Sequence, residues 1–445
     1  MSTTSVPSAR PSFLQSDRLL ARAAQPLVRF LHVEAAGGIL LVLASVAALA
    51  WANSPWQATY GSFWSTGIRI EIGPYLFEED LLHVVNDLLM AVFFFVVGME
   101  IKRELVVGDL RDRRAVGLPV VAALGGMVIP ALIYTAFNAG GGGVDGWGIP
   151  MATDVAFALG VVALLGHRVP ASVKVLLLTL AIVDDIGAIV VIAVFYTDDL
   201  RPQLLLVAGG LALVAHLLHR VNVTARPLFV AVGLGLWIAV YESGVHATIA
   251  GVVLGLLTPA RPMQTELEAD EVVDVLENRP ELHAEDVRAI ARLIRGSVSA
   301  CDRLIEALHP WTSYVIVPIF ALANAGVVLS SDTFADPSAV LLGVTAGLVV
   351  GKLVGVVSFS WLAVRLGLGR LPSDTRWGHV VGVGAVAGIG FTVSLFITGL
   401  AFESPNLQAD AKAGILLASV AAAALGAVLF GVAGRRAARM PGEGE

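Results

Sequence analysis

Apolar runs of about 20 residues recur from one end of the chain to the other, and no other feature constrains the fold as much. A helix needs about 20 apolar residues to cross the hydrocarbon core of a bilayer. Only 15% of the residues are charged and 56% are apolar, whereas a typical soluble domain contains about 25% charged residues. Because alternating short strands are absent except at one place, the sequence predicts an all-α polytopic membrane protein rather than a membrane β-barrel.

Twelve apolar segments can be separated, with boundaries accurate to a few residues. They cover residues 34–53, 81–104, 115–137, 149–166, 172–196, 203–220, 227–241, 244–258, 311–329, 338–364, 377–402 and 410–434. We interpret them as twelve transmembrane helices. The chain then divides into a tail at 1–33, helices one to eight at 34–259, a soluble stretch at 260–309, helices nine to twelve at 310–434 and a tail at 435–445.

Lysine and arginine set the orientation, because basic residues concentrate on the cytoplasmic side of membrane proteins. If the N-terminus is cytoplasmic, all but four of the 29 basic residues fall in cytoplasmic tails, loops or adjoining helix ends. Arg69, Arg201 and Lys412 fall outside, and Lys352 lies within the membrane. We therefore expect both termini to be cytoplasmic, a lipid bilayer as the surroundings, and no nucleic-acid partner.

The first outer loop contains the one stretch of alternating polar and apolar residues. Ile68, Ile70 and Ile72 alternate with charged residues ahead of a Gly-Pro pair. This pattern predicts a short outer β-hairpin near residues 67–77. The hairpin is either an ordinary loop or an edge strand that contacts a second protomer.

The soluble stretch at 260–309 is acidic in its first half and amphipathic in its second. Apolar residues recur there at helical spacing with arginines between them, which predicts an amphipathic helix. These apolar positions are Val287, Ile290, Ile294, Val298, Cys301, Leu304 and Leu308. Such a helix is either an interfacial linker or a regulatory element.

Two spans, at 149–166 and 377–402, contain or adjoin an unusual number of helix-interrupting residues. Gly148, Pro150 and Gly160 surround a polar Thr-Asp pair in the first, and glycines recur through the second. Interrupted spans at matching places in the two halves of a chain are typical of broken helices in inverted-repeat transporters. The alternative is that the glycines only allow close helix packing.

Three acids lie within the predicted spans. Asp184 and Asp185 interrupt the middle of an apolar run, where an ionised carboxylate costs roughly 2.5–3.5 kcal/mol. Because neighbours on a helix point about 100° apart, one acid can face an ion while the other faces a partner. Asp154 follows Pro150, and unwinding there would free carbonyl oxygens beside Thr153 and Asp154 for a hard cation. Asp154 is otherwise a helix N-cap.

Lys352 has about a dozen apolar residues on either side, which places it roughly 18 Å from either end of its helix. Its side chain spans about a third of that distance. A lysine at this depth is expected to pair with an acid. The sequence leaves Asp154, Asp184 and Asp185 as the possible partners.

Other polar residues near the spans give weaker signals. Asn86 and Asp87 form either a buried hydrogen-bonded pair or part of a site. Glu100 and Glu104 lie at the cytoplasmic end of the second span, which favours a solvated helix end. His246 lies just inside the outer end of a later span, where an imidazole either responds to pH or is structural.

Several longer motifs resemble those of the NhaA-type sodium/proton antiporters, over roughly residues 34–434. They are ATDVAFALG at 152–160, LAIVDDIGAI at 180–189, SGVHAT at 243–248, LHPW at 308–311, FALANAG at 320–326, GK at 351–352 and GIGFT at 388–392. The stretch at 261–300 departs from the shorter members of the family. Because of that departure, the resemblance does not predict the pH at which the protein becomes active. The motifs of the ion site are unaffected.

The resemblance implies a twelve-helix fold of the bacterial inner membrane with inverted repeats and two crossed, broken helices. It implies a homodimer joined partly through the outer hairpin, and sodium or lithium ions and protons as the transported species, with no cofactor. It implies that Asp154 and Asp185, with Thr153, bind the cation, and that Asp184 and Lys352 form the neighbouring pair. Family positions that respond to pH match Glu100, Glu104, His246 and Glu306.

The simplest mechanism is competition, in which sodium and protons bind the same carboxylates and the site faces one side at a time. If one sodium replaces protons on two carboxyl groups, the exchange moves net charge. Two alternative functions would use different chemistry. An intramembrane protease would use two aspartates that share a proton, and a sodium-coupled symporter of an organic anion would need a second polar pocket.

Overall fold

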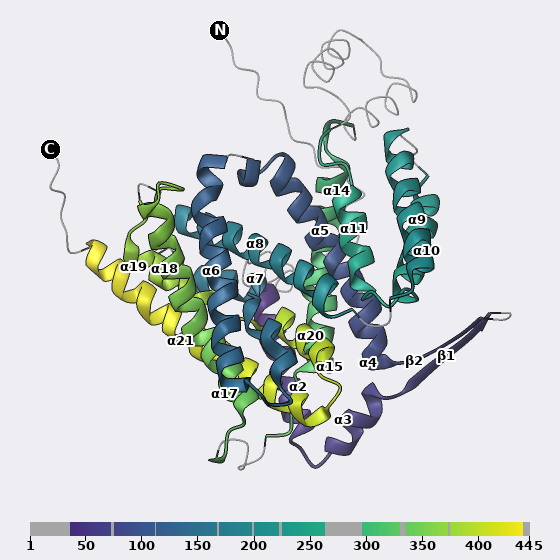
Figure 1. Ribbon diagram of the computed structural model, residues 1–445, viewed down its shortest axis with the longest axis horizontal. Coiled ribbons are helices and arrows are strands. Elements are labelled where there is room, and N and C mark those ends of the chain that lie inside the picture. Colours follow the sequence, from purple (N-terminus) through teal and green to yellow (C-terminus); the bar gives the residue numbers. More distant parts are fainter. Residues whose placement is uncertain are drawn as a thin grey trace, which may run out of the picture.

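The computed structural model is a bundle of helices from which one β-hairpin projects (Figure 1). It describes residues 36–72, 75–111, 113–166, 169–197, 200–221, 225–262, 296–329, 335–372 and 374–438. The predictions for the tail at 1–33 and for Val287, Ile290 and Ile294 of the amphipathic helix lie outside these ranges.

Eight helical segments of the described residues are long and apolar enough to cross a membrane. They are Leu81–Val106, Val116–Asn138 in α6 (Arg113–Asn138), Val144–Leu165, Ala171–Phe195 (α8), Pro202–Arg220 (α9), Ala300–Asn324, Ala339–Arg365 and Pro405–Ala433 in α21 (Pro405–Ala438). Two bent pairs raise the number to ten: α2 (Ala36–Ala52) with α3 (Gln57–Trp64), and α19 (Trp377–Val386) with α20 (Phe391–Ala401). Apart from the hairpin, the protein is an all-helical membrane protein.

Two shorter apolar helices, α10 (Arg226–Tyr241) and α11 (Thr248–Leu257), lie at the seventh and eighth predicted segments. The ninth predicted segment, 311–329, is helical as far as Asn324, and it is continuous with a helix over the predicted amphipathic positions Cys301, Leu304 and Leu308. Its helix begins at α14 (Ala300–Trp311), whose N-cap Ser299 accepts a hydrogen bond from the backbone N–H of Asp302. A π-helical turn, η6 (Thr312–Ile316), follows Pro310 and joins α14 to α15 (Val317–Asn324), so the proline is accommodated without ending the helix.

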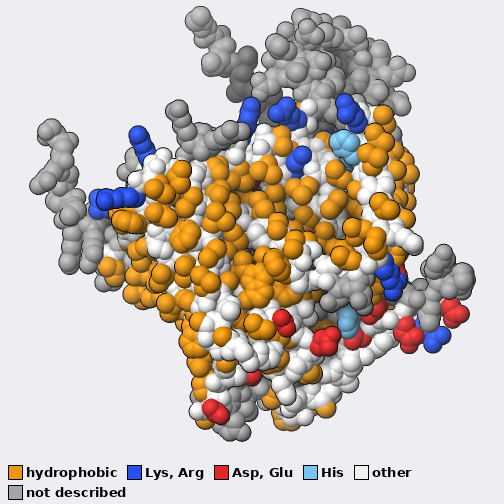
Figure 2. Space-filling view, in the orientation of Figure 1, with side chains coloured by type: hydrophobic (Ala, Val, Ile, Leu, Met, Phe, Trp, Pro, Cys, Tyr) orange, Lys and Arg blue, Asp and Glu red, His pale blue; other side chains and the backbone are white. Residues whose placement is uncertain are grey.

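Hydrophobic side chains form a broad band across the face drawn in Figure 2. Basic side chains gather at one end of that band, and acidic side chains gather toward the opposite end. Many large apolar residues on the surface are exposed, among them Leu164, Leu206 and Val420. An exposed apolar band between two polar ends is the surface that a bilayer requires.

The predicted hairpin is confirmed. Strand β1 (Gly67–Ile72) pairs antiparallel with β2 (Tyr75–Asp80), with Gly67 opposite Asp80. The second strand runs past residue 77 and leads directly into α4 (Leu81–His83), where the Asp80 side chain accepts a hydrogen bond from the His83 N–H at 2.8 Å. No linker therefore separates the hairpin from the second span.

Both predicted interruptions are present. In the first, a 3-10 segment, η4 (Val144–Met151), is followed by three non-helical residues and then by α7 (Val155–Leu165). In the second, α19 and α20 meet at 45° across a short break. The two breaks contact each other, because the backbone N–H of Asp154 donates a hydrogen bond to the Ile389 carbonyl at 2.6 Å.

Glycines allow several helices of the bundle to approach closely. A Cβ atom at Gly355, in α18 (Lys352–Arg365), would lie 2.2 Å from the carbonyl oxygen of Gly125 in α6. At Gly251 in α11 it would lie 2.1 Å from the carbonyl oxygen of Ala91, in α5 (Met90–Val106). Glycine therefore serves close packing in this protein as well as the helix breaks.

Adding one methyl group at Gly355 tests this packing. In Gly355→Ala the new Cβ would overlap a backbone oxygen, so α6 and α18 must separate, and we expect a loss of about 1–3 kcal/mol in stability. Gly209→Ala in α9 is the matched control, because a Cβ there meets nothing within 4 Å. Thermal unfolding in detergent measures both, and equal Tm values would contradict the packing argument.

Candidate ion-binding site

The side chains of Lys352 and Asp184 form an ion pair inside the bundle. Lys352 Nζ lies 2.6 Å from Asp184 Oδ2, and both side chains are fully buried. Lys352 begins α18 directly after a π-helical turn, η7 (Gly347–Gly351), and Asp184 lies in the middle of α8. Of the three acids that the sequence left open, Asp184 is the one that contacts Lys352. Two opposite charges thereby neutralise each other where neither could reach water.

Thr153, in the first break, joins this ion pair to the second break. Its hydroxyl oxygen lies 2.7 Å from Asp184 Oδ2 and 2.8 Å from the Ala387 carbonyl oxygen. Because a hydroxyl has one proton, it donates to these two acceptors in alternation or shares the proton between them. Asp184 Oδ1 is buried and has no hydrogen-bond partner among the described residues.

Asp154 is the N-cap of α7 and also binds the start of α20. Its Oδ1 accepts a hydrogen bond from the Phe157 N–H at 2.9 Å. Its Oδ2 accepts two hydrogen bonds from Thr392, one from the backbone N–H at 3.1 Å and one from the hydroxyl at 2.7 Å. A carboxylate between two helix N-termini is stabilised by their unsatisfied N–H groups. The capping role and a role in ion binding are therefore compatible.

Asp185 differs from the other two acids because it has no hydrogen bond or ion pair within the described part of the chain. Its side chain is half-buried, and its electrostatic neighbours are three acids, Asp184, Asp154 and Glu100, together with Lys352. A carboxylate without a partner among other acids is costly to ionise. A proton or a bound cation would remove that cost.

The structure therefore brings Thr153, Asp154, Asp184, Asp185 and Lys352 into one region around the two breaks. Thr153 contacts Asp184 rather than Asp185. Sequence reasoning missed Thr392, whose hydroxyl and N–H both bind Asp154. The sequence did contain a signal for Thr392. It follows a predicted break, and a residue at the start of a helix has a backbone N–H without a partner in that helix.

The residues expected to respond to pH are spread over the protein. Glu100 and Glu104 lie in α5, where Glu104 Oε1 is 3.7 Å from Arg103. Glu306 is exposed on α14. His246 lies toward the hairpin end, where its Nε2 is 3.4 Å from Asp87 Oδ1. Only Glu100 is an electrostatic neighbour of Asp185.

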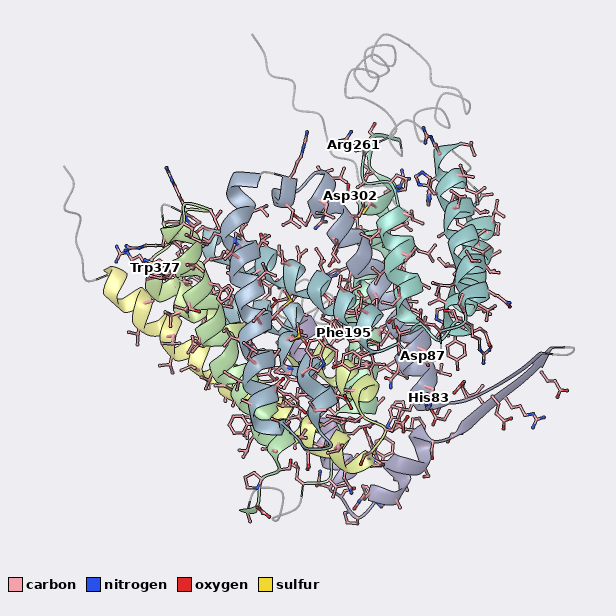
Figure 3. All side chains as sticks on the ribbon, viewed as in Figure 1. His83, Asp87, Phe195, Arg261, Asp302 and Trp377 are labelled. Atoms are coloured by element: carbon pink, nitrogen blue, oxygen red, sulfur yellow. The ribbon has the colours of Figure 1, made fainter. Side chains whose placement is uncertain are left out.

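A pocket of about 330 Å³ opens beside His246 and Asp87. Figure 3 shows His83 and Asp87 near the base of the hairpin, with Arg261 and Asp302 at the opposite end. Asn86, which also lines the pocket, accepts a hydrogen bond from the Asn324 side chain at 2.8 Å. The expected Asn86–Asp87 region is therefore a polar recess at the hairpin end and not only a buried pair.

The Lys352–Asp184 pair can be tested by a double-mutant cycle. Either Lys352→Ala or Asp184→Asn leaves the other charge buried without its partner, which costs about 3–5 kcal/mol. The double variant leaves no unpaired charge, so its loss of Tm should be much smaller than the sum of the two single losses. Melting curves of the four proteins measure the coupling. Additive losses would mean that the two charges do not stabilise each other.

Comparison with known proteins places the chain among transporters. A family model described as Na+/H+ antiporter 1 matches residues 28–430. The Na(+)/H(+) antiporter NhaA of Rhodopirellula baltica is 49% identical over 410 residues, covering 90% of this chain and 92% of that protein. The Na(+)/H(+) antiporter NhaA 3 of Frankia alni is 47% identical, covering 94% of this chain and 90% of that protein. Because the family match extends over most of its length, the chain belongs to the Na+/H+ antiporter 1 family.

Proposed function

We propose that this protein is a secondary active antiporter that exchanges cytoplasmic sodium, or lithium, for external protons. The deciding observation is the arrangement of three neighbouring acids. Lys352 neutralises Asp184, whereas Asp185 remains half-buried without a partner beside Asp154. The names of the curated relatives, which are sodium/proton antiporters, support the same reaction.

Sodium and protons would compete for this site because an ionised carboxylate without a partner is unfavourable there. A buried carboxylate must be protonated or bound to a cation, so Asp185 exchanges one for the other. Asp154 supplies a second carboxylate, and Thr392 would stabilise it in its ionised form through two hydrogen bonds. Carboxylate, hydroxyl and carbonyl oxygens suit a hard ion such as sodium. The transported ions are substrates, and we expect no resident cofactor.

Net charge movement follows if one sodium replaces two protons. Asp154 and Asp185 can each give up a proton, whereas Asp184 already faces a cation. The exchange could then draw on membrane potential, which is worth about 2.3 kcal/mol per charge for each 100 mV. Such an exchanger would serve cellular pH and sodium homeostasis.

Alternating access fits a twelve-span architecture with inverted repeats. If each bent pair and each of the shorter helices α10 and α11 is one span, the described helices would supply the twelve predicted segments. The two interrupted spans lie in different halves of the chain and contact each other at their breaks, where the Asp154 N–H donates a hydrogen bond to the Ile389 carbonyl. Broken spans that meet at mid-membrane are the usual ion site of such transporters.

The orientation we propose places both termini in the cytoplasm of a bacterial cell and the hairpin outside. The basic end of the surface in Figure 2 would face the cytoplasm. Glu100 and Glu104 would then respond to cytoplasmic pH, and His246 would lie toward the outside. Glu100 is the strongest of the four candidates because it is an electrostatic neighbour of Asp185.

The two alternative functions, intramembrane proteolysis and symport of an organic anion, fit the site less well. A protease dyad needs two aspartates that share one proton, but Asp154 is hydrogen-bonded to Thr392 and Phe157, and family membership indicates a transporter. Symport of an organic anion needs a second substrate pocket with a basic group. The polar pocket beside Asp87 instead contains an acid and two histidines.

Replacing Asp185 tests the site. Asp185→Asn preserves the side-chain volume and removes the charge, so apparent sodium affinity should fall at least about tenfold, equivalent to about 1.4 kcal/mol, while the protein still inserts. Glu403→Gln, at an exposed carboxylate, is the control and should exchange normally. Everted vesicles with a pH-sensitive dye, given sodium, lithium, potassium or an organic acid, measure both variants. Near-normal exchange by Asp185→Asn would overturn the assignment.

We also propose that the hairpin joins two protomers, because it projects from the bundle with a free strand edge (Figure 1). Deleting residues 69–75 should shift the detergent-solubilised particle toward a monomer and leave exchange largely intact. Arg69→Ala is the control, because it removes only an exposed contact with Glu78 at 3.9 Å. Light scattering reports the mass of the particle, and an unchanged dimer after the deletion would refute the proposal.

A further inference from the structure

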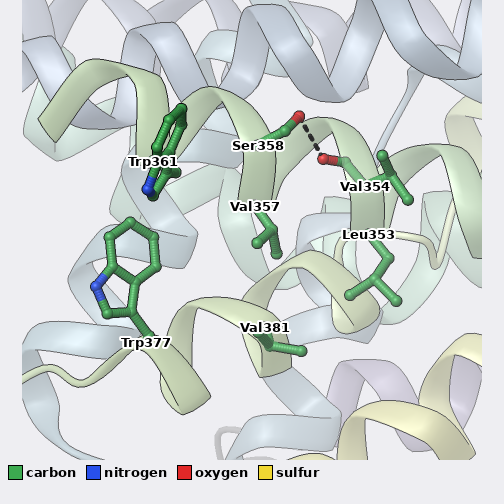
Figure 4. A pocket seen from close by; sticks show the side chains of 7 residues that line it. All are labelled: Leu353, Val354, Val357, Ser358, Trp361, Trp377 and Val381. Carbon is green, nitrogen blue, oxygen red and sulfur yellow. Dashed lines mark hydrogen bonds between the residues drawn. The ribbon is translucent and has the colours of Figure 1, made fainter. Parts of the chain in front are cut away.

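A groove on the apolar surface lies between α18 and α19 and has a volume of about 540 Å³ (Figure 4). Leu353, Val354, Val357 and Trp361 line it from one face of α18, and Trp377 and Val381 line it from α19. Apart from the indole N–H groups of Trp361 and Trp377 at one end, its polar lining side chain is Ser358, which donates a hydrogen bond to the Val354 carbonyl of its own helix at 2.6 Å. Between the tryptophans and Leu353 the walls of the groove are therefore apolar.

One end of the groove is aromatic and positively charged. Figure 4 shows the rings of Trp361 and Trp377 beside each other at this end. The Arg365 guanidinium lies over the Trp361 ring at 5.8 Å from its centroid. Arg370 and Arg376 lie in the connection between α18 and α19, and all three arginines are exposed. Tryptophan and arginine together are typical of the interface between lipid headgroups and hydrocarbon.

The other end of the groove reaches the depth of the ion site. Leu353 lines this end, and it directly follows Lys352, whose side chain is buried against Asp184 on the inner side of the same helix. From Leu353 to Trp361 the helix rises about 12 Å. The groove thus runs from a basic interface to the middle of the bilayer.

We propose that this groove binds one acyl chain of an anionic phospholipid, such as phosphatidylglycerol, with the phosphate group held at Arg365. Charge complementarity selects this occupant. A zwitterionic lipid has no net charge to pair with Arg365 and Arg370 at this end, whereas an anionic lipid is attracted to basic residues near the membrane surface. The apolar walls accept a hydrocarbon chain and exclude a headgroup.

Occupancy of the groove would affect the ion site through two helices. The groove follows the line of contact between α18, which begins at Lys352, and α19, which leads into the break where Ala387 accepts a hydrogen bond from Thr153. A chain that lies along both helices would stabilise their contact and so the position of Lys352 relative to the break. Lipid binding itself does not depend on the transport function proposed above, but its effect on exchange does.

Binding can be measured without transport. Purified protein in detergent is titrated with phosphatidylglycerol or with phosphatidylcholine of the same acyl chains, and bound lipid is counted by native mass spectrometry alongside Tm. We expect tighter binding and a larger rise in Tm with phosphatidylglycerol. Arg365→Gln should weaken phosphatidylglycerol binding about fivefold. Arg220→Gln, at an exposed arginine that ends α9, should leave it unchanged.

Two further variants separate the chain site from the headgroup site. Val357→Trp fills the groove and should abolish retention of either lipid, whereas Leu206→Trp, at a lipid-exposed position on α9, should not. Equal binding of the two lipids, or equal effects of Arg365→Gln and Arg220→Gln, would overturn the proposal. A change of oligomeric mass in Val357→Trp would overturn it in favour of a protein contact. Because Arg365 is on the surface, its variant remains informative even if Val357→Trp does not fold.

Discussion

An ionised side chain in the middle of a bilayer has to be neutralised, and this requirement organises the interior of the protein. Lys352 cannot reach water from its place on α18, so it holds Asp184 at 2.6 Å. The same carboxylate oxygen contacts Thr153. One acid of the adjacent pair is thereby held by a cation, whereas the other, Asp185, has no ion pair among the described residues. Asp184 and Asp185 therefore differ because Asp184 contacts a lysine on another helix, and not because of the residues beside them in the sequence.

Each of the two broken spans supplies hydrogen-bond partners for groups that the break in the other span exposes. A break exposes backbone N–H and carbonyl groups that lipid cannot satisfy. The Ile389 and Ala387 carbonyls of the second break accept hydrogen bonds from the Asp154 N–H and the Thr153 hydroxyl of the first. The Asp154 carboxylate also accepts a hydrogen bond from the backbone N–H of Thr392, at the start of α20. Neither interruption would be stable alone, which explains why both occur in one protein and meet at one place.

The sequence predicted most of the spans and the acids, because charges and prolines inside apolar runs are conspicuous. It could not decide which acid contacts Lys352, since three acids on two segments lie at comparable depth and only the fold, which places Asp184 of α8 beside Lys352 of α18, selects one. It treated the amphipathic helix and the ninth span as separate elements, whereas α14, a π-helical turn and α15 form one continuous helix that includes Pro310. Thr392 was missed because its role depends on a carboxylate more than 200 residues away.

Asp184 and Asp185 are joined by a single peptide unit, and under the exchange proposed above that adjacency would couple cation binding to the position of Lys352. Any displacement of α8 that turns Asp185 toward one side of the membrane also moves Asp184, and through it Lys352 and α18. If Asp185 binds the cation as proposed, cation occupancy and the position of α18 are thermodynamically linked. By reciprocity, a ligand that changes the ion affinity through α18 has its own affinity changed by the ion by the same factor.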